Sequence, residues 1–149
     1  MTKTLDVYVY GMTVLSTIHR LQGPFPQADT YQEITQTTVM PGGEGGNAAI
    51  LLSHWGLKTQ LDGCMFSETT AGPLRAYFDR YGVDCSLLPT PPDFTGWRDI
   101  VFCDGESRTV FGWFQQHFSG ERRWWTEPCA ASIAAAHCVA LDPFFGPTS

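Results

Sequence analysis

Residues 41–49, PGGEGGNAA, constrain the fold of this chain more than any other stretch. Four glycines occupy five positions and are followed by Asn47, whose side chain offers both donors and an acceptor. Glycine has no Cβ, so such a loop can take positive φ angles and bring backbone N–H groups close to a ligand. A helical run follows over 48–55, and the free N–H groups at its start favour polar or anionic ligands. The pattern predicts a binding loop, and a tight strand-to-helix turn without a ligand is the simpler alternative.

The order of elements around this loop is typical of an α/β fold. Residues 5–11 are an apolar, β-rich run ending in Gly11, which predicts a central parallel strand. In open α/β sheets ligands bind beyond the carboxyl ends of the strands, so we expect a site just after Gly11. Further strands are expected over 58–65 and 137–142, and further helices over 69–81 and 127–136.

A second, smaller sheet is expected from segments that do not suit a sheet buried on both faces. Residues 31–40 are mostly polar, so this β-prone stretch needs one face open to solvent. Residues 12–20 are also β-prone, and Asp104-Gly105 between two β-prone arms predicts a hairpin over 96–113. In that hairpin Arg108 is interpreted as a solvated cross-strand partner rather than a ligand group. The chain is therefore expected to form a Rossmann-like, mostly parallel sheet flanked by helices. A small β-sheet lid, from about 12–40 and 96–113, is inserted into it.

Composition excludes several classes of partner and site. The 149 residues carry a net charge of −6, which argues against nucleic acid and against an anionic membrane surface as partners. No apolar run approaches the roughly 20 residues that cross a bilayer, and the N-terminus is not expected to be a signal peptide. Five cysteines without C-x-x-C spacing predict buried thiols in a reduced, cytoplasmic protein. Four histidines without ligand spacing predict no metal site.

A dinucleotide-binding fingerprint competes with these interpretations of the loop. Gly43, Gly45 and Ala48 have the spacing G-x-G-x-x-A, and Asp62 follows 19 residues after Gly43, at the end of the next strand. The context fits less well, because the preceding strand is polar and Pro41 intervenes, whereas the fingerprint belongs after a buried apolar strand. A dinucleotide-dependent oxidoreductase therefore stays open as an alternative function.

The same stretch resembles the signature of a known family. The pattern Gly42-Gly43-x-Gly45-x-Asn47-x-Ala49, with Gly56 seven residues later, is similar to the N-terminal signature of the ribokinase-like carbohydrate kinases, the PfkB group. One position departs, because Phe66 stands where the family usually has a further glycine. The resemblance runs over most of the chain and covers the N-terminal half of a typical member. It implies a ribokinase-like fold in which the β-sheet lid lies over the substrate.

The resemblance implies ATP-dependent phosphorylation of a sugar, nucleoside or related hydroxyl compound, with this chain carrying the sugar-binding half. ATP and Mg²⁺ are both expected to need a C-terminal half. The catalytic residues are expected beyond residue 149, where the family has an aspartate in a Gly-Ala-Gly-Asp motif. The segment alone is therefore expected to be inactive. A homodimer formed through the β lid is the expected assembly, because the aromatic residues of the hairpin are too apolar for a solvated surface.

The resemblance also implies site residues, position by position. Ser16 stands where the family has an aspartate that binds sugar hydroxyls. A hydroxyl makes weaker hydrogen bonds than a carboxylate, so a non-catalytic sugar-binding relative stays open as a second interpretation. The other implied substrate contacts are Gly43, Glu44 and Asn47 in the loop, Asp99, Val101 and Trp113 in the hairpin, and Asp142 after the last strand.

Overall fold

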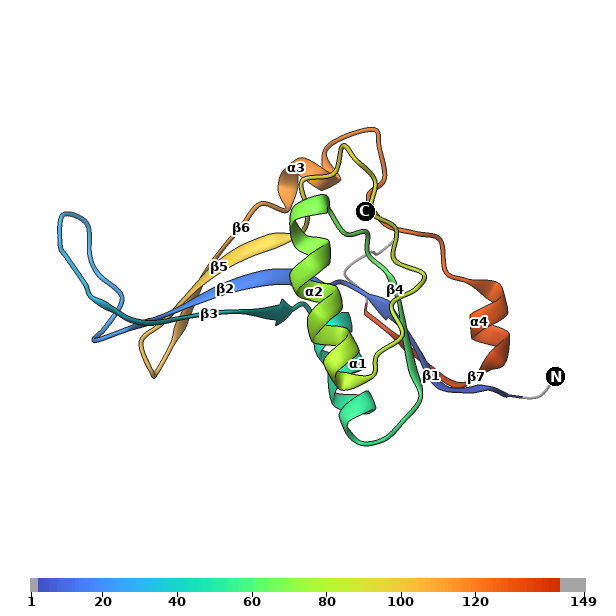
Figure 1. Ribbon diagram of the computed structural model, residues 1–149. Helices are drawn as coiled ribbons and strands as arrows, with labels where there is room; N and C mark the ends of the chain where they lie inside the picture. The colour runs from blue at the N-terminus through green and yellow to red at the C-terminus, as the bar shows by residue number, and fades with distance from the viewer. Residues whose placement is uncertain (1–2, 143–149) are drawn as a thin grey trace.

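The computed structural model describes residues 3–142 and contains two β-sheets (Figure 1). In the first sheet β1 (Leu5–Gly11) lies between β4 (Thr59–Gly63) and β7 (Ala136–Leu141), and both pairings are parallel. The prediction of a central parallel strand over 5–11 is therefore confirmed. The helices are α1 (Glu44–His54), α2 (Glu68–Tyr81), α3 (Gln115–Phe118) and α4 (Ala130–Ala135).

Side chains of β1 build a core on each face of the first sheet. Val7 and Val9 lie in a cluster with residues of β4, α1 and α2, including Leu74 and Phe78. Tyr8 lies in a different cluster, which includes the first residue of β7. Both clusters form because successive side chains of a strand point to opposite faces. Figure 1 shows the consequence, with α1 and α2 together on one side of this sheet and α4 on the other.

The second sheet, called the small sheet from here on, has the strand order β3-β2-β5-β6 and projects from the first as an arm (Figure 1). Its strands are β2 (Val14–Leu21), β3 (Ile34–Gly42), β5 (Arg98–Cys103) and β6 (Arg108–Gly112). β2 pairs antiparallel with β3 and parallel with β5, and β5 pairs antiparallel with β6. The segments predicted over 12–40 and 96–113 thus share one sheet. Most of β3 is exposed, as its polar sequence predicts.

Helix α2 begins and ends at residues with capping signals. The Thr70 N–H donates to the Ser67 hydroxyl at 3.1 Å, and the Ser67 N–H donates to the Thr70 hydroxyl at 2.9 Å. Gly82 ends the helix in the left-handed conformation, with φ 72°. Leu74 and Phe78 are buried on the face towards the core. The helix predicted over 69–81 is confirmed and starts one residue earlier.

Helix α1 begins at Glu44, so the prediction that it starts at residue 48 is wrong. Gly45 and Gly46, which the sequence assigns to a loop, lie buried in the first helical turn. At Gly45 the helix packs closely on β1, because a Cβ there would lie 2.7 Å from the carbonyl carbon of Gly11. A Cβ on Gly46 would lie 2.9 Å from the Oγ1 atom of Thr13. Within residues 41–49, all of which the structure describes, positive φ occurs at Gly43 alone, the N-cap, at 83°.

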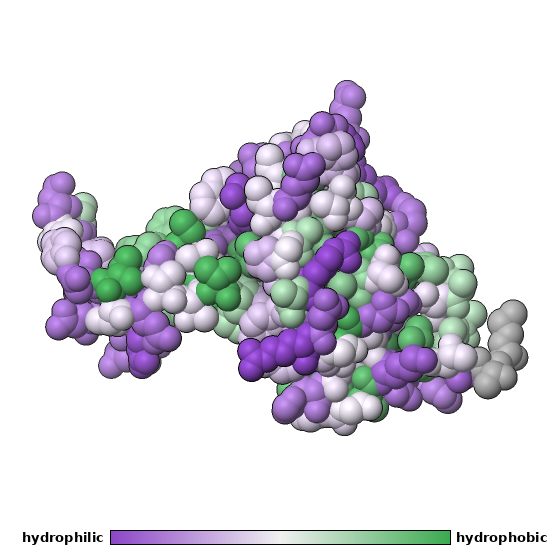
Figure 2. Space-filling view, viewed as in Figure 1, coloured by the Kyte–Doolittle hydropathy of each residue, from purple (hydrophilic) through white to green (hydrophobic). Residues whose placement is uncertain are grey.

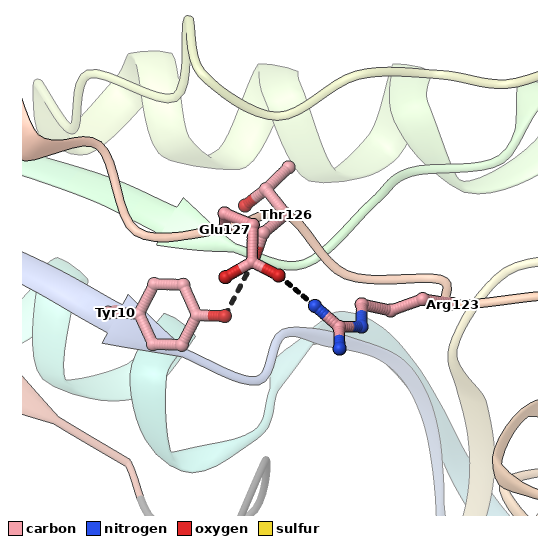
Figure 3. A network of polar contacts seen from close by, with 4 residues as sticks. All are labelled: Tyr10, Arg123, Thr126 and Glu127. Carbon is pink, nitrogen blue, oxygen red and sulfur yellow. Dashed lines mark hydrogen bonds and ion pairs between the residues drawn. The ribbon is translucent and has the colours of Figure 1, made fainter.

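The segment that leads from the small sheet to α4 is tied to the end of β1. The Tyr10 hydroxyl donates to the Thr126 carbonyl at 2.6 Å, and Arg123 forms an ion pair with Glu127 beside it (Figure 3). The Cys129 N–H then donates to the Tyr8 hydroxyl at 2.9 Å. Helix α4 begins after these contacts, so it is shorter than the helix predicted over 127–136.

All five cysteines are free thiols. The prediction that they are buried is correct for Cys64 and Cys85 and wrong for Cys138, which is exposed on the edge strand β7. Cys103 and Cys129 are half-buried. Between residues 3 and 142 no helix has the length and apolar character to cross a membrane.

Candidate substrate-binding site

A cavity of about 400 Å³ is lined by residues of the small sheet and of the N-terminal end of α1. The polar lining residues are Ser16 on β2, Glu44 and Asn47 on α1, Asp99 on β5 and Arg108 on β6. The apolar lining includes Met12, Val14, Ile18, Met40, Val101, Val110 and Phe114. A largely apolar hollow with a few converging polar groups is the usual form of a small-molecule site. This one suits a ligand with both hydroxyl groups and exposed carbon atoms.

The pleat of the small sheet decides which of its residues reach the cavity. Successive side chains alternate between the faces of a strand. The lining residues accordingly come in pairs two positions apart: Ser16 and Ile18, Asp99 and Val101, Arg108 and Val110. The residues between them, at 17, 100 and 109, face the other side, called the outer face from here on.

Asp99 and Ser16 are direct cross-strand neighbours in the pairing of β2 with β5. Burial raises the pKa of the Asp99 carboxyl, and a hydrogen bond with Ser16 and the charge of Arg108 offset part of that increase. In the described part of the chain, the Oδ1 atom of Asp99 is buried without a hydrogen-bond partner. A carboxyl group in this state has unused acceptor capacity, which a ligand hydroxyl at the cavity wall can satisfy.

The N-terminal end of α1 forms a second wall of the cavity. Gly43 is the N-cap, and no side chain caps the first N–H groups of the helix. Asn47 is exposed in the first turn, and no hydrogen bond of its amide group is found within residues 3–142. Glu44 is also exposed there and contributes a carboxylate. This wall therefore offers amide, carboxylate and backbone N–H groups to a ligand.

Arg108 lines the cavity, although from sequence we interpret it as a solvated cross-strand residue without a ligand role. It pairs with Cys103, and it shares a face of the hairpin with Asp99 and Val101. The sequence contains a signal for this placement. The turn Asp104-Gly105 fixes which residues of the two arms pair, and pairing fixes which side chains share a face.

Two residues that the resemblance implies, Trp113 and Asp142, lie outside this cavity. Trp113 follows β6, and the guanidinium carbon of Arg98 lies 5.6 Å from the centre of its ring. Asp142 follows β7, and its Oδ2 atom accepts a hydrogen bond of 2.9 Å from the Met12 N–H. It lines a second cavity of about 190 Å³, which shares Glu44 with the first. A substrate contact of Trp113 or Asp142 stays a prediction.

The carboxylate of Asp62 is held by hydrogen bonds within the protein, so the basis of the dinucleotide interpretation is lost. Its Oδ2 atom accepts a 2.5 Å hydrogen bond from the Tyr8 hydroxyl, and its Oδ1 atom accepts one of 2.6 Å from the Thr126 hydroxyl. The N–H groups of Gly63 and Cys129 also donate to this carboxylate. Asp62 is 1% exposed, and its acceptor sites are occupied, so it is not available to the ribose of a cofactor.

The cavity lining does not suit a Mg²⁺-bound triphosphate. Such a group needs several cationic or N–H donors around its phosphates. Arg108 is the one cationic side chain in the lining, beside the carboxylates of Glu44 and Asp99. Over residues 3–142, no three His, Cys, Asp or Glu side chains lie close enough together to hold a metal ion. No step of phosphoryl transfer is therefore assigned to these residues.

Known proteins match this chain in structure. Its sequence matches no family model and no curated protein. A candidate ribokinase from Agrobacterium tumefaciens gives a TM-score of 0.76 at 19% identity, over 93% of this chain and 44% of that one. A nucleoside kinase from Methanocaldococcus jannaschii, an archaeal member of the ribokinase family, gives a TM-score of 0.66 at 18% identity. The match covers 97% of this chain and 54% of that one. A ribokinase from Cryptococcus neoformans var. grubii, in complex with ADP, gives a TM-score of 0.61 at 17% identity. The match covers 73% of this chain and 34% of that one.

These likenesses confirm the predicted ribokinase-like fold, with its parallel sheet flanked by helices and its separate small sheet. The chain spans about half the length of these structures, or less, between 34% and 54%. Phe66, the departure from the family signature, is buried in the core beside Phe78 and does not disturb the fold.

Proposed function

We propose that this chain is the sugar-binding half of an ATP-dependent kinase that phosphorylates a sugar, a nucleoside or a related hydroxyl compound. The observation that carries the proposal is the convergence of Ser16, Asn47 and Asp99 in one cavity beside the start of α1. Each hydroxyl that a polyol buries needs a hydrogen-bond partner, and these side chains supply hydroxyl, amide and carboxyl groups. The ribokinase-like fold supports the same substrate class.

The roles follow from the chemistry of each group. Asp99 accepts hydrogen bonds from ligand hydroxyls, and Asn47 donates to or accepts from them. Gly43 has no side chain, so its backbone allows close approach of the ligand. Glu44 accepts hydrogen bonds from the ligand at the α1 wall of the cavity, and Val101 covers the carbon face of the sugar ring. In this proposal Ser16 supports Asp99 as well as contacting the ligand.

ATP, Mg²⁺ and the group that activates the acceptor hydroxyl are assigned to a further part of a longer protein. The support is the fraction of the kinase structures that this chain spans, and the lack of fit between the cavity and a triphosphate. The contribution of residues 3–142 is to bind and orient the hydroxyl, with the small sheet as a lid that excludes water. Alone, the chain is expected to be inactive.

Assembly as a homodimer through the outer face of the small sheet is part of the proposal. Val39, Phe111 and Trp113 are 51%, 50% and 44% exposed. Figure 2 shows hydrophobic residues among hydrophilic ones along the projecting arm. Large apolar side chains gathered on one face mark an interaction surface. Free thiols at all five cysteines support a reducing, cytoplasmic location.

A non-catalytic sugar-binding relative is the second candidate, and Ser16 is the observation that favours it. A hydroxyl in the cavity wall holds a sugar less firmly than a carboxylate. Asp99 compensates for this by placing a carboxyl group on the neighbouring strand. The two candidates share the binding site and differ in catalysis.

Calorimetric titration of the chain with neutral and acidic sugars and with nucleosides tests the site. Saturable binding of one compound, weakened by Asn47→Ala, supports the proposal, and absence of binding by every compound overturns it. A longer protein that contains this chain separates the two candidates. Release of ADP from Mg-ATP that depends on the bound compound identifies a kinase, and binding without turnover identifies the non-catalytic relative.

A further inference from the structure

Arg108 is a cation at the cavity with no carboxylate partner. Among residues 3–142 the ion pairs are those of Arg122 with Asp93 and Arg123 with Glu127, and none of these four residues lines the cavity. Arg108 is exposed, but its charge acts on Asp99 and lowers the pKa of that carboxyl. Arg108 therefore adds a positive charge to the cavity that Asp99 also lines.

The charges of the cavity are separated along its length. Glu44 stands at the α1 end, next to Gly42, which pairs with Val14 at the start of β2. Arg108 stands at the other end, paired with the last residue of β5 before the hairpin turn. An anionic group is repelled by Glu44 and attracted by Arg108, so this arrangement sets the direction in which a charged ligand lies.

We propose that the preferred ligand is a sugar with one oxyanion, a carboxylate or a phosphate, which lies against Arg108 while the hydroxyl groups face Asp99 and Asn47. This inference rests on the proposed function and narrows its substrate class. A guanidinium matches either oxyanion through two parallel hydrogen bonds. One guanidinium fits one such group, in contrast to the several charges of a triphosphate. The apolar stretch formed by Val101 and Val110 separates the two polar ends of the site.

The test compares two matched pairs of sugars by calorimetric titration of the full chain at low salt: glucose with glucuronate, and ribose with ribose 5-phosphate. We expect the anionic member of at least one pair to bind about tenfold more tightly, the usual size of one charge-assisted hydrogen-bonded contact. Arg108→Gln should bring the two members to within about threefold of each other, and Arg108→Lys should restore part of the preference. Arg98→Gln is the control, because Arg98 is exposed on the outer face of β5 and does not line this cavity.

The outcomes separate this inference from the proposed function. A preference confined to one pair supports the inference and identifies the oxyanion as carboxylate or phosphate. Equal binding within both pairs, or a preference that Arg108→Gln leaves intact, overturns the inference and leaves the sugar site standing. Failure of all four compounds to bind overturns the inference. The proposed function is overturned only when the neutral sugars and nucleosides of its own titration also fail to bind. Should Arg108→Gln fold poorly, the unmodified chain still decides, because a charge-based preference must fall as salt is added.

Discussion

Asp99 on β5 lies directly opposite Ser16 on β2, so the carboxyl group in the cavity wall has a hydroxyl as its cross-strand neighbour. Burial raises the pKa of Asp99 in the folded protein relative to the unfolded chain. The folded protein then binds this proton more readily, so the ionised carboxylate lowers stability at pH values above the folded pKa. This loss of stability disappears as the pH falls through the folded pKa and the carboxyl group is protonated.

Asp99→Asn tests this relationship, because asparagine keeps the shape and removes the charge. We expect the variant to melt at a higher temperature than the unmodified chain near neutral pH, and the difference to shrink as the medium is acidified. Ligand affinity should fall in the same variant. Thermal unfolding measured across pH checks the predicted difference in stability, with Glu106→Gln in the exposed hairpin turn as control. A variant less stable than the parent at neutral pH would contradict the assignment.

Ser16→Ala should raise the pKa of Asp99 further. The hydrogen bond with Ser16 favours the ionised carboxylate and lowers its pKa, so its removal leaves burial opposed by Arg108 alone. A carboxyl ¹³C NMR titration of the two proteins measures the difference. A pKa that stays constant or falls would show that the Ser16 hydroxyl does not support Asp99.

Asn47→Ala should leave folding intact and weaken ligand binding. The side chain is exposed, and its amide makes no hydrogen bond with residues 3–142. Loss of a ligand contact should cost about 1–3 kcal/mol of affinity, because a polar group of the ligand is left without a partner. Calorimetry measures the affinity, and Gln27→Ala in the exposed loop before β3 is the control. Unchanged affinity in Asn47→Ala would remove this residue from the site.

Gly45→Ala should lower stability much more than Gly72→Ala. A Cβ at Gly45 would lie 2.8 Å from the Cα atom of Gly11, so α1 must move off β1, at a cost of about 1–3 kcal/mol. A Cβ at Gly72 in α2 meets no neighbouring element within 4 Å, but Gly72 precedes Pro73, which crowds a Cβ in the helical conformation. Alanine there gains helix propensity and loses to this crowding, so stability should change little. Urea unfolding of both variants checks the pair. Equal stability of the two would mean that α1 does not pack on β1 this closely.

Val39→Lys should dissociate the proposed homodimer. Val39 lies on the outer face of β3 and is exposed in the single chain, so a subunit interface there would bury it. A lysine in the middle of such an interface leaves a charge without water. Light scattering of a longer protein that contains this chain, at micromolar concentration, measures the mass. Thr38→Lys, on the opposite face of the same strand, is the control. A monomer before any substitution would exclude the interface.

Local sequence signals predict much of this fold. The apolar run over 5–11, the capping signals of α2 and the hairpin turn at Asp104-Gly105 lead to the elements observed. The start of α1 could not be predicted in this way. Glycine is read from sequence as a loop former, whereas Gly45 is needed for the contact of a helix with a strand more than thirty positions earlier, at Gly11.

The sequence predicts several residues that line the cavity and does not predict its geometry, and a substrate contact of any of them stays a prediction. Six of the implied residues line one cavity: Ser16, Gly43, Glu44, Asn47, Asp99 and Val101. The pairing of Ser16 with Asp99 joins strands more than eighty positions apart, and no local pattern fixes the register of such strands. Arg108 was missed for a related reason, since a charged residue in a hairpin looks solvated until its face is known.

The alternation of side chains along β5 also limits which changes of length the chain can tolerate. Insertion of a single residue before Asp99 would turn Asp99 and Val101 to the outer face and bring Ile100 and Phe102 into the cavity. The wall would lose its carboxyl group and the outer face would gain a charge, although no residue had been replaced. Functional homologues should therefore keep the number of residues fixed in β5 and in the turn over 104–107, which sets the pairing of β5 with β6. They should vary in length in the longer loop between β2 and β3.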